Sequence, residues 1–194
     1  MKRIYAFDFD GTLTAADSLF LFLRYACGMS RFLLGMLIQS PFIIAAVLGF
    51  YDNGRAKERL FGWFFRGMPI NAFDNLCQRF ASSHRHILRP LAVEAIKKAQ
   101  AEGAEVLIVS ASIENWVQPF FPSVRVVGTQ VEVENHILTG YFSTPNCHGR
   151  EKVRRLLAVY PDRESYHLTA FGDSGGDREL LQMADEAHYK PFRT

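Results

Sequence analysis

The chain has 194 residues and a net charge of +2, and 48% of its residues are hydrophobic and 13% aromatic. This length and composition allow one domain of ordinary size plus an insertion, with a packed core. The small net charge and the absence of a long basic run argue against a nucleic-acid partner.

The cysteines and the first residues of the sequence indicate a cellular compartment. Cys27, Cys77 and Cys147 are odd in number and widely spaced, and they lack zinc-site spacing, so we expect free thiols in a reducing compartment. The sequence enters a strand at once, without the apolar run and small-residue site of a signal peptide. A cytoplasmic protein is therefore expected.

The first strand is followed by two carboxylates. Residues 4–7 read as a short apolar strand, and Asp8, Asp10 and Gly11 come next. Side chains two apart on an extended strand end point the same way, and two carboxylates held together repel unless they share a proton or a cation. Mg²⁺ suits such oxygen ligands. An acidic turn after an edge strand is the alternative reading.

Residues 15–87 have a different character. Apolar residues recur here at helical spacing, and breaks fall at Gly28, Ser40-Pro41, residues 52–54 and residues 67–69. This pattern predicts about four helices and no strand.

The apolar part of this helical region is unusual. From Phe32 to Phe50 no charged residue occurs, and residues 61–65 are rich in aromatic side chains. The run is long enough for a membrane helix, but Ser40-Pro41 is expected to divide it, and no second span follows that could return the chain to its core. Contact with a membrane surface through residues 32–65 is one reading. A buried helical core and a contact between two copies of the chain are the others. Cations flank the apolar pieces at Arg31, Arg55, Lys57, Arg59 and Arg66.

Strands and helices alternate in the rest of the chain, which predicts a parallel sheet with helices on both faces. Expected strands cover residues 105–110, 124–127, 166–171 and 187–189, and an expected hairpin covers residues 131–142. Expected helices cover residues 89–102, 149–160 and 177–183, and a further helix is capped by Ser112 and stops near Pro119.

Polar residues stand at three more element ends. Ser110 ends a buried strand, Lys152 lies in the first turn of a helix, and Asp173 and Asp177 follow another apolar strand within a glycine-rich loop. A hydroxyl before a helix N-terminus can bind an anion, and a cation in a first helical turn opposes the helix dipole. Each residue alone also has an ordinary reading, as a helix cap or a solvated side chain.

Together these motifs resemble those of the haloacid dehalogenase superfamily of phosphatases and phosphotransferases. The resemblance rests on Asp-Phe-Asp-Gly-Thr-Leu-Thr at 8–14, Ser110, Lys152 with Gly149 three residues before it, and Gly-Asp-x-x-x-Asp at 172–177. The resemblance implies a Rossmann-like α/β core formed by residues 1–14 and 88–194. It also implies an inserted α-helical cap at residues 15–87.

The resemblance implies a mechanism as well. Asp8 would attack phosphorus and form an aspartyl phosphate, and Asp10 would act as acid and then base. Mg²⁺ would be held by Asp8, the backbone carbonyl of Asp10 and Asp173. Asp177 would support these ligands or bind the ion through a water molecule. Phosphate oxygens would be bound by Ser110, Lys152 and the backbone near Gly11 and Ala111.

Two features bear on the substrate. In phosphoserine phosphatases an asparagine that touches phosphate usually precedes the last aspartate, but Gly176 stands there in this chain. Asp17 lies at the offset where those enzymes bind the substrate amine, and Arg59 is a candidate for a second anionic group. Asp17 can instead be a helix cap, and Arg59 part of a solvated helix face.

Segments 23–25 (Leu-Arg-Tyr) and 54–56 (Gly-Arg-Ala) also resemble the cap of the C-type phosphatidylglycerophosphate phosphatases. The sequence therefore predicts a Mg²⁺-dependent phosphomonoester hydrolase acting on a small phosphorylated substrate. A phosphatase for phospholipid head groups and a silent binding protein with the same fold are the alternatives.

Overall fold

The computed structural model describes residues 1–193. The helices are α1 Ser18–Val47, α2 Asn53–Phe65, α3 Ile70–Ser83, α4 Pro90–Ala101, α5 Glu114–Val117, α6 Arg150–Val159 and α7 Arg178–Met183. The strands are β1 Lys2–Phe7, β2 Glu105–Ile113, β3 Arg125–Thr129, β4 Val131–Glu134, β5 Ile137–Phe142, β6 Tyr166–Gly172 and β7 Glu186–Tyr189.

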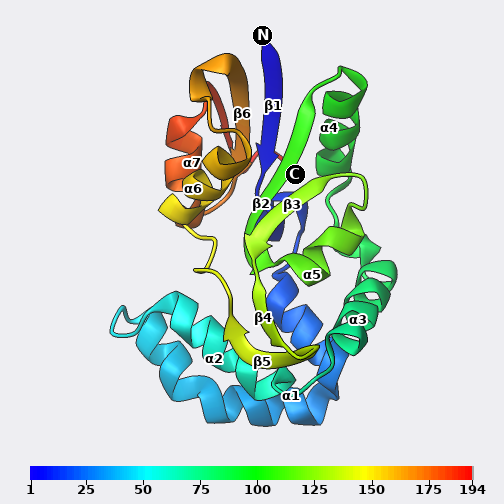
Figure 1. The fold of residues 1–194 in the computed structure, drawn as a ribbon, viewed down its shortest axis with the longest axis vertical. Helices are drawn as coiled ribbons and strands as arrows, with labels where there is room; N and C mark the ends of the chain where they lie inside the picture. Colours follow the sequence, from blue (N-terminus) through cyan, green and yellow to red (C-terminus); the bar gives the residue numbers. More distant parts are fainter. Residues whose placement is uncertain (194) are drawn as a thin grey trace.

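Five strands form a parallel sheet in the order β3-β2-β1-β6-β7 (Figure 1). Strand β1 lies at its centre and pairs with β2 on one side and β6 on the other, with Phe7 opposite Ile108 and Phe171. The chain order reverses at β1, and in such sheets ligands bind outside the carboxyl ends of the strands at that point. Asp8 follows β1 directly.

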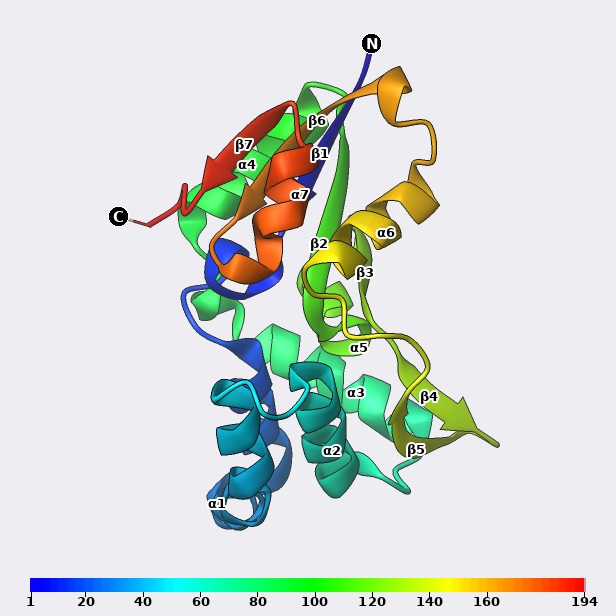
Figure 2. The same cartoon turned by 90° about the vertical axis from the view of Figure 1, so that its left-hand side faces the viewer.

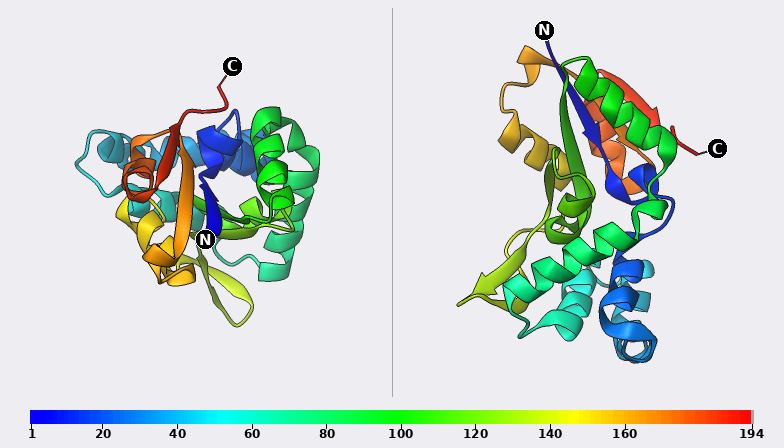
Figure 3. Two further views of the ribbon diagram at one scale, coloured as in Figure 1. Left: turned by 90° about the horizontal axis from the view of Figure 1, so that it is seen from above. Right: turned by 90° about the vertical axis from the view of Figure 1, so that its right-hand side faces the viewer.

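Helices cover both faces of this sheet, because side chains alternate along its strands (Figure 3, left). Phe7 packs in the cluster that contains Ile96 of α4, whereas Ile4 packs in the cluster that contains Leu156 of α6 and Leu180 of α7. The predicted α/β fold class is confirmed.

Helices α1, α2 and α3 lie beyond the carboxyl end of the sheet, and the hairpin β4–β5 lies with them (Figure 2). The amide of Gly67 donates to the carbonyl of Leu138 in β5, and the amide of Ile70 donates to His136 in the hairpin turn. The hairpin therefore joins the helical region, although it follows β3 in the chain. The division into a core and a cap at residues 14 and 88 stays a prediction.

The predicted break at Ser40-Pro41 is wrong, because α1 continues through Pro41 to Val47. Proline lacks the N–H that would bond the carbonyl of Leu37, and the Ser40 hydroxyl donates to that carbonyl instead, at 2.7 Å. Gly28 does interrupt the helical backbone, with a positive φ of 73°.

The aromatic cluster at residues 61–65 forms core rather than surface. Phe61, Phe64 and Phe65 are 1–2% exposed. Of the readings left open for this segment, the buried helical core is confirmed for these three residues, and the rings of Phe61 and Phe65 pack against Phe22 and Phe73.

Helix α1 is long and apolar enough to cross a membrane, and only 11% of its most apolar part is buried. Its outward side carries exposed residues such as Leu33, Leu37 and Ile44, which are 57%, 71% and 56% exposed. The chain thus has a covered aromatic cluster and an uncovered apolar helix face.

Candidate active site

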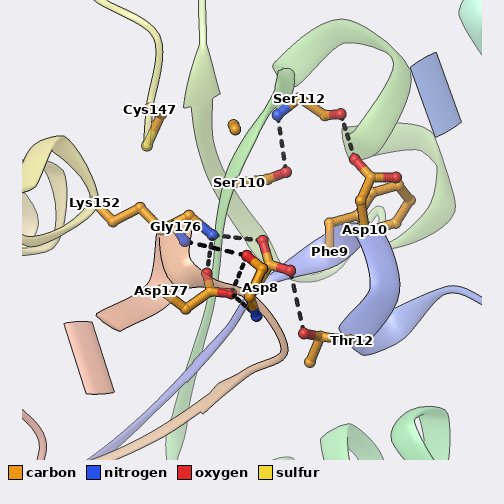
Figure 4. A network of polar contacts seen from close by, with 12 residues as sticks. Asp8, Phe9, Asp10, Thr12, Ser110, Ser112, Cys147, Lys152, Gly176 and Asp177 are labelled. Atoms are coloured by element: carbon orange, nitrogen blue, oxygen red, sulfur yellow. Dashed lines mark hydrogen bonds and ion pairs between the residues drawn. The ribbon is translucent and has the colours of Figure 1, made fainter. Parts of the chain in front are cut away.

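The candidate site lies at the carboxyl end of the sheet, where elements distant in sequence meet (Figure 4). Asp8 follows β1, Ser110 lies near the end of β2, Lys152 lies in the first turn of α6, and Asp173 and Asp177 follow β6. All come from strand ends or first helical turns, so the backbone at each position is fixed by the sheet or by the helix packed on it.

Lys152 joins two carboxylates. Its Nζ lies 2.5 Å from Oδ1 of Asp8 and 2.6 Å from Oδ1 of Asp177, and the lysine side chain is 2% exposed. Thr12 donates to the other oxygen of Asp8 at 3.1 Å. The neighbouring Arg150 is exposed, so of these two basic residues at the start of α6 only Lys152 reaches Asp8 and Asp177.

The charged groups of this cluster shift one another's pKa values. Burial raises the pKa of Asp8 to about 7, against the nearby positive charge of Lys152 and together with the negative charge of Asp177. Burial acts against the charged form of Lys152, but Asp8 and Asp177 hold its pKa above the ordinary lysine value. Asp177 is also buried, yet Lys152 and backbone N–H donors keep its pKa below the usual range. Asp8, Asp173 and Asp177 outnumber the cations Lys152 and Arg193, which leaves room for a further positive charge.

The donor set suits a magnesium ion. Asp8, Asp173 and Asp177 each offer a carboxylate oxygen, and these atoms lie within 4.8 Å of one another. Gly11 has φ +79°, and a Cβ built there would lie 2.3 Å from Oδ2 of Asp173, so only glycine lets the loop approach that carboxylate. Arg193 pairs with Asp173 at the rim. Hard oxygen ligands in this number fit Mg²⁺ better than a softer metal.

Asp177 also shapes the loop that carries Asp173. Its Oδ2 accepts hydrogen bonds from the amides of Asp173 and Ser174 at 3.1 and 3.0 Å, and from the Ser174 hydroxyl at 3.0 Å. One carboxylate therefore orients the loop with one oxygen and holds Lys152 with the other.

Asp10 is held apart from this cluster by two serines. The amide of Ser18 donates to Oδ1 of Asp10 at 2.7 Å, and the hydroxyl of Ser112 donates to Oδ2 at 2.5 Å. Trp116 donates to the Ser18 hydroxyl at 3.1 Å and fixes it in turn. The prediction that Ser112 caps a helix is wrong, because β2 runs on to Ile113 and α5 begins only at Glu114.

Burial raises the pKa of Asp10, and the negative charge of Asp17 acts in the same direction, whereas the Ser112 and Ser18 hydrogen bonds oppose the shift. A carboxyl with a raised pKa holds a proton at higher pH than usual. This direction of the pKa shift favours Asp10 as a proton donor.

A cavity of about 290 Å³ opens beside Asp10, between the helical region and the sheet. Its polar lining residues are Asp10, Asp17, Asn53, Lys57, Ser112, Asn146 and His148. Its apolar lining includes Phe20, Ile43, Val47 and Leu60. The cavity could therefore bind both the charged part and a short apolar part of one ligand.

Lys57 enters this cavity from α2, and sequence reasoning placed it only among surface cations. Its Nζ donates to the carbonyl of Ala111 at 2.9 Å. Burial lowers its pKa, while Asp10 and Asp17 oppose the shift. The sequence carries no signal that singles out Lys57 for such a role, since α2 also contains the exposed cations Arg55 and Arg59.

The structure also places the three remaining predicted site residues. Ser110 is buried and its hydroxyl accepts from the amide of Ser112 at 3.0 Å. Asp17 caps α1 by accepting from Leu19 at 2.9 Å and also lines the cavity. Arg59 donates to Gln39 at 3.1 Å and stacks over Phe42, and it is not among the residues that line the cavity with Asp10.

The structure gives a physical reason for Gly176. A Cβ at this position would lie 2.6 Å from the ring of His148, which itself lines the cavity. A larger residue at 176 would therefore displace His148, so glycine here is matched to a histidine on the opposite segment.

A family model of the haloacid dehalogenase-like hydrolases matches residues 5–182. The chain belongs to this family. The motif-based resemblance is thereby confirmed, and the acidic cluster at the carboxyl end of the sheet is the part of this hydrolase to which the motifs point.

Three solved structures and one curated protein show what this hydrolase is similar to. The protein CicA of Caulobacter vibrioides is 36% identical over 98% of this chain and 86% of CicA. A protein of unknown function from Bordetella pertussis has a TM-score of 0.80 at 19% identity, covering 96% of this chain and 89% of that one. A phospho-aspartyl intermediate analogue of phosphoserine phosphatase has a TM-score of 0.60 at 16% identity, covering 96% and 85%. The chain spans 60% of a hydrolase of this family from Salmonella enterica, with a TM-score of 0.69 at 21% identity and 93% of this chain covered.

Proposed function

We propose that this protein is a Mg²⁺-dependent phosphomonoester hydrolase that acts through an aspartyl phosphate on Asp8. The observation that carries the proposal is the contact of Lys152 with both Asp8 and Asp177, next to Asp173. A buried lysine can neutralise both a carboxylate nucleophile and a bound phosphate, and phosphoryl transfer depends on such positioning and neutralisation.

In the first step Asp8 attacks phosphorus, and the bond from phosphorus to the ester oxygen breaks. Asp10, held by Ser18 and Ser112, gives its proton to that leaving oxygen. In the second step Asp10 takes a proton from water, and this water attacks the aspartyl phosphate to release inorganic phosphate. Asp8 is regenerated as a carboxylate.

Mg²⁺ held by Asp8 and Asp173, with Asp177 behind them, would supply charge neutralisation for the phosphoryl oxygens. The Ser110 hydroxyl and backbone N–H groups near Gly11 and Ala111 would bind the same oxygens. Asp177 keeps Lys152 and the Asp173 loop in place.

A silent binding protein is a weaker proposal, because binding alone does not need an acid held in two hydrogen bonds beside a nucleophile. Hydrolysis of p-nitrophenyl phosphate in the presence of Mg²⁺, and its loss in EDTA, is the experiment that tests turnover. Binding of phosphate without any hydrolysis would favour the silent protein.

Asp10→Asn is expected to slow hydrolysis of an alkyl phosphate by roughly 10²–10⁴-fold, because the basic leaving oxygen needs a proton. The loss on p-nitrophenyl phosphate should be smaller, since its leaving oxygen is stable without one. Steady-state rates on both substrates check this, with Asp162→Asn, an exposed carboxylate elsewhere, as control. Equal losses on the two substrates would count against the acid role.

Mg²⁺ is expected to raise the thermal unfolding temperature, and by more at about pH 8 than at about pH 6. The Asp8 pKa rises from about 3.9 in the unfolded chain to about 7 in the metal-free fold. Ionised Asp8 therefore destabilises the metal-free fold, a cost that grows from about pH 4 and is complete above pH 7. Below pH 7 the metal must also displace a proton.

Thermal unfolding in Mg²⁺ and in EDTA across this pH range measures the effect. The variant Asp173→Asn should lose most of the Mg²⁺ shift. A shift that is absent at every pH, or larger at the acidic end, would contradict the assignment of these carboxylates to the metal.

A phosphate on a lipid head group is the second candidate substrate, and the apolar wall of the cavity favours it. Ile43 and Val47 of α1 and Leu60 of α2 are among the residues that line the cavity. Asp17 and Lys57 favour instead a small charged ester such as phosphoserine. Rates on phosphoserine, glycerol phosphate and a short-chain phosphatidylglycerophosphate would separate the two classes.

A further inference from the structure

The second part of helix α1, after Gly28, is apolar on two opposite sides. Its inner side packs on α2 so closely that a Cβ on Gly35 would lie 2.4 Å from Phe64 and 2.5 Å from Trp63. Gln39 on the same side accepts a hydrogen bond from Arg59. These contacts fix the rotation of α1 about its axis, so its outward side is determined.

The outward side forms what we call the outer stripe. It consists of Leu33, Leu34, Leu37, Ile38, Ile44 and Leu48, which are 47–71% exposed. No charged residue lies between residues 32 and 50, and α1 is the outermost element at its end of the molecule (Figures 1 and 2). Contiguous apolar surface of this kind on a folded protein marks an interaction site.

The charges around the outer stripe point to the partner. Helix α1 contains no acidic residue. Arg31 precedes the stripe and is held by a hydrogen bond to the carbonyl of Phe64, and Arg59 is held over the ring of Phe42 at 3.8 Å. Both are exposed. Both arginines are held on the side of α1 that packs on α2, and an apolar stripe with cations on the other side of the helix matches the acyl region and the phosphates of an anionic lipid surface.

We propose that the outer stripe docks α1 in the plane of an anionic phospholipid bilayer. The helix lies on the bilayer rather than across it, because its first part is anchored in the protein core through the buried Phe22 and Leu23. A span would also require α1 to leave Trp63 and Phe64, whose rings lie against Gly35.

The stripe adjoins the candidate active site. Val47 is 82% exposed and also lines the cavity beside Asp10, together with Ile43. A phosphate ester held in the bilayer would therefore reach the cavity along α1. This consequence rests on the proposed phosphatase function, whereas the docking itself does not.

Co-sedimentation with vesicles tests the docking. The full chain is expected to pellet with vesicles of equal parts phosphatidylglycerol and phosphatidylcholine at low salt, and to keep part of that binding at high salt. The variant Leu33→Gln/Leu37→Gln/Ile44→Gln should lose roughly ten-fold in binding. The variant Leu91→Gln, which changes a leucine 47% exposed on α4, should bind as wild type does.

A second variant distinguishes a loss of docking from misfolding of the triple variant. Tryptophan fluorescence of Leu37→Trp should be quenched by vesicles that contain brominated lipid, whereas that of Leu91→Trp should not. Hydrolysis of p-nitrophenyl phosphate by the triple variant should match wild type, so a failure of docking and a failure of the phosphatase proposal give different results.

Three outcomes would overturn the docking. The wild type stays in the supernatant with anionic vesicles at low salt, or the triple variant pellets as well as wild type. The third is a dimer in light scattering that the triple variant dissociates, because a second copy of the chain would then cover the stripe.

Discussion

Asp8→Asn is expected to abolish both turnover and phosphoryl labelling of the protein. An amide is a poor nucleophile, and no other carboxylate in the described chain contacts Lys152 except Asp177, whose second oxygen is engaged by the Asp173 loop. The loss should be the largest of any single substitution. Acid-quenched labelling and steady-state rates measure it.

The fold of this variant should survive, because asparagine has the shape of aspartate. Its amide oxygen can still accept from Lys152, and its NH2 group can donate to the hydroxyl oxygen of Thr12. Asp162→Asn is the matched control for an aspartate-to-asparagine change outside the site. Label retained on the Asp8→Asn protein would place the nucleophile elsewhere.

Lys152→Met is expected to cost roughly 3–5 kcal/mol of folding stability at neutral pH in addition to activity, because it leaves Asp8 and Asp177 buried without their cation. For a chain of this size that corresponds to a fall in the unfolding temperature of roughly 6–20 °C. Thermal unfolding of the metal-free protein measures it.

The pH dependence of that loss has a definite sign. In the wild type the lowered pKa of Asp177 contributes stability above its unfolded value, and that stability is lost as the pH falls. Without Lys152 the carboxylates repel, so acidification should recover stability relative to wild type. Lys2→Met, which breaks the exposed pair with Glu105, should cost at most about 1 kcal/mol. Equal effects of the two substitutions would refute a buried counter-ion role for Lys152.

The position of the acidic cluster could be predicted because parallel strands share their carboxyl ends. Asp8 and Asp173 each follow an apolar run, so a sheet built from those runs must bring them to one edge. Lys152 was placed by the family resemblance, and the unfavourable position of a cation in a first helical turn agreed with a functional role but did not require it. Their catalytic roles remain predictions.

The surroundings of Asp10 could not be predicted in the same way. Ser18 and Ser112 reach it from α1 and β2, and Lys57 reaches the same cavity from α2. Contacts between side chains of different helices and strands produce no periodic pattern in the sequence. A serine before a helix, moreover, is interpreted as a helix cap. The continuation of α1 through Pro41 was equally hidden, because it depends on one hydroxyl replacing one missing N–H.

The central place of β1 also has a consequence for how the chain acquires its structure. Residues 2–7 leave the ribosome before their partners, because they pair with residues 105–108 and 166–171. Such distant pairing makes folding slow, because long loops must close before the contacts form. Strand β1 therefore stays unpaired on both edges after α1 and its uncharged run have been synthesised. Nascent chains stalled before β6 should be sensitive to protease and bound by chaperones, and those carrying residues through β7 should be resistant.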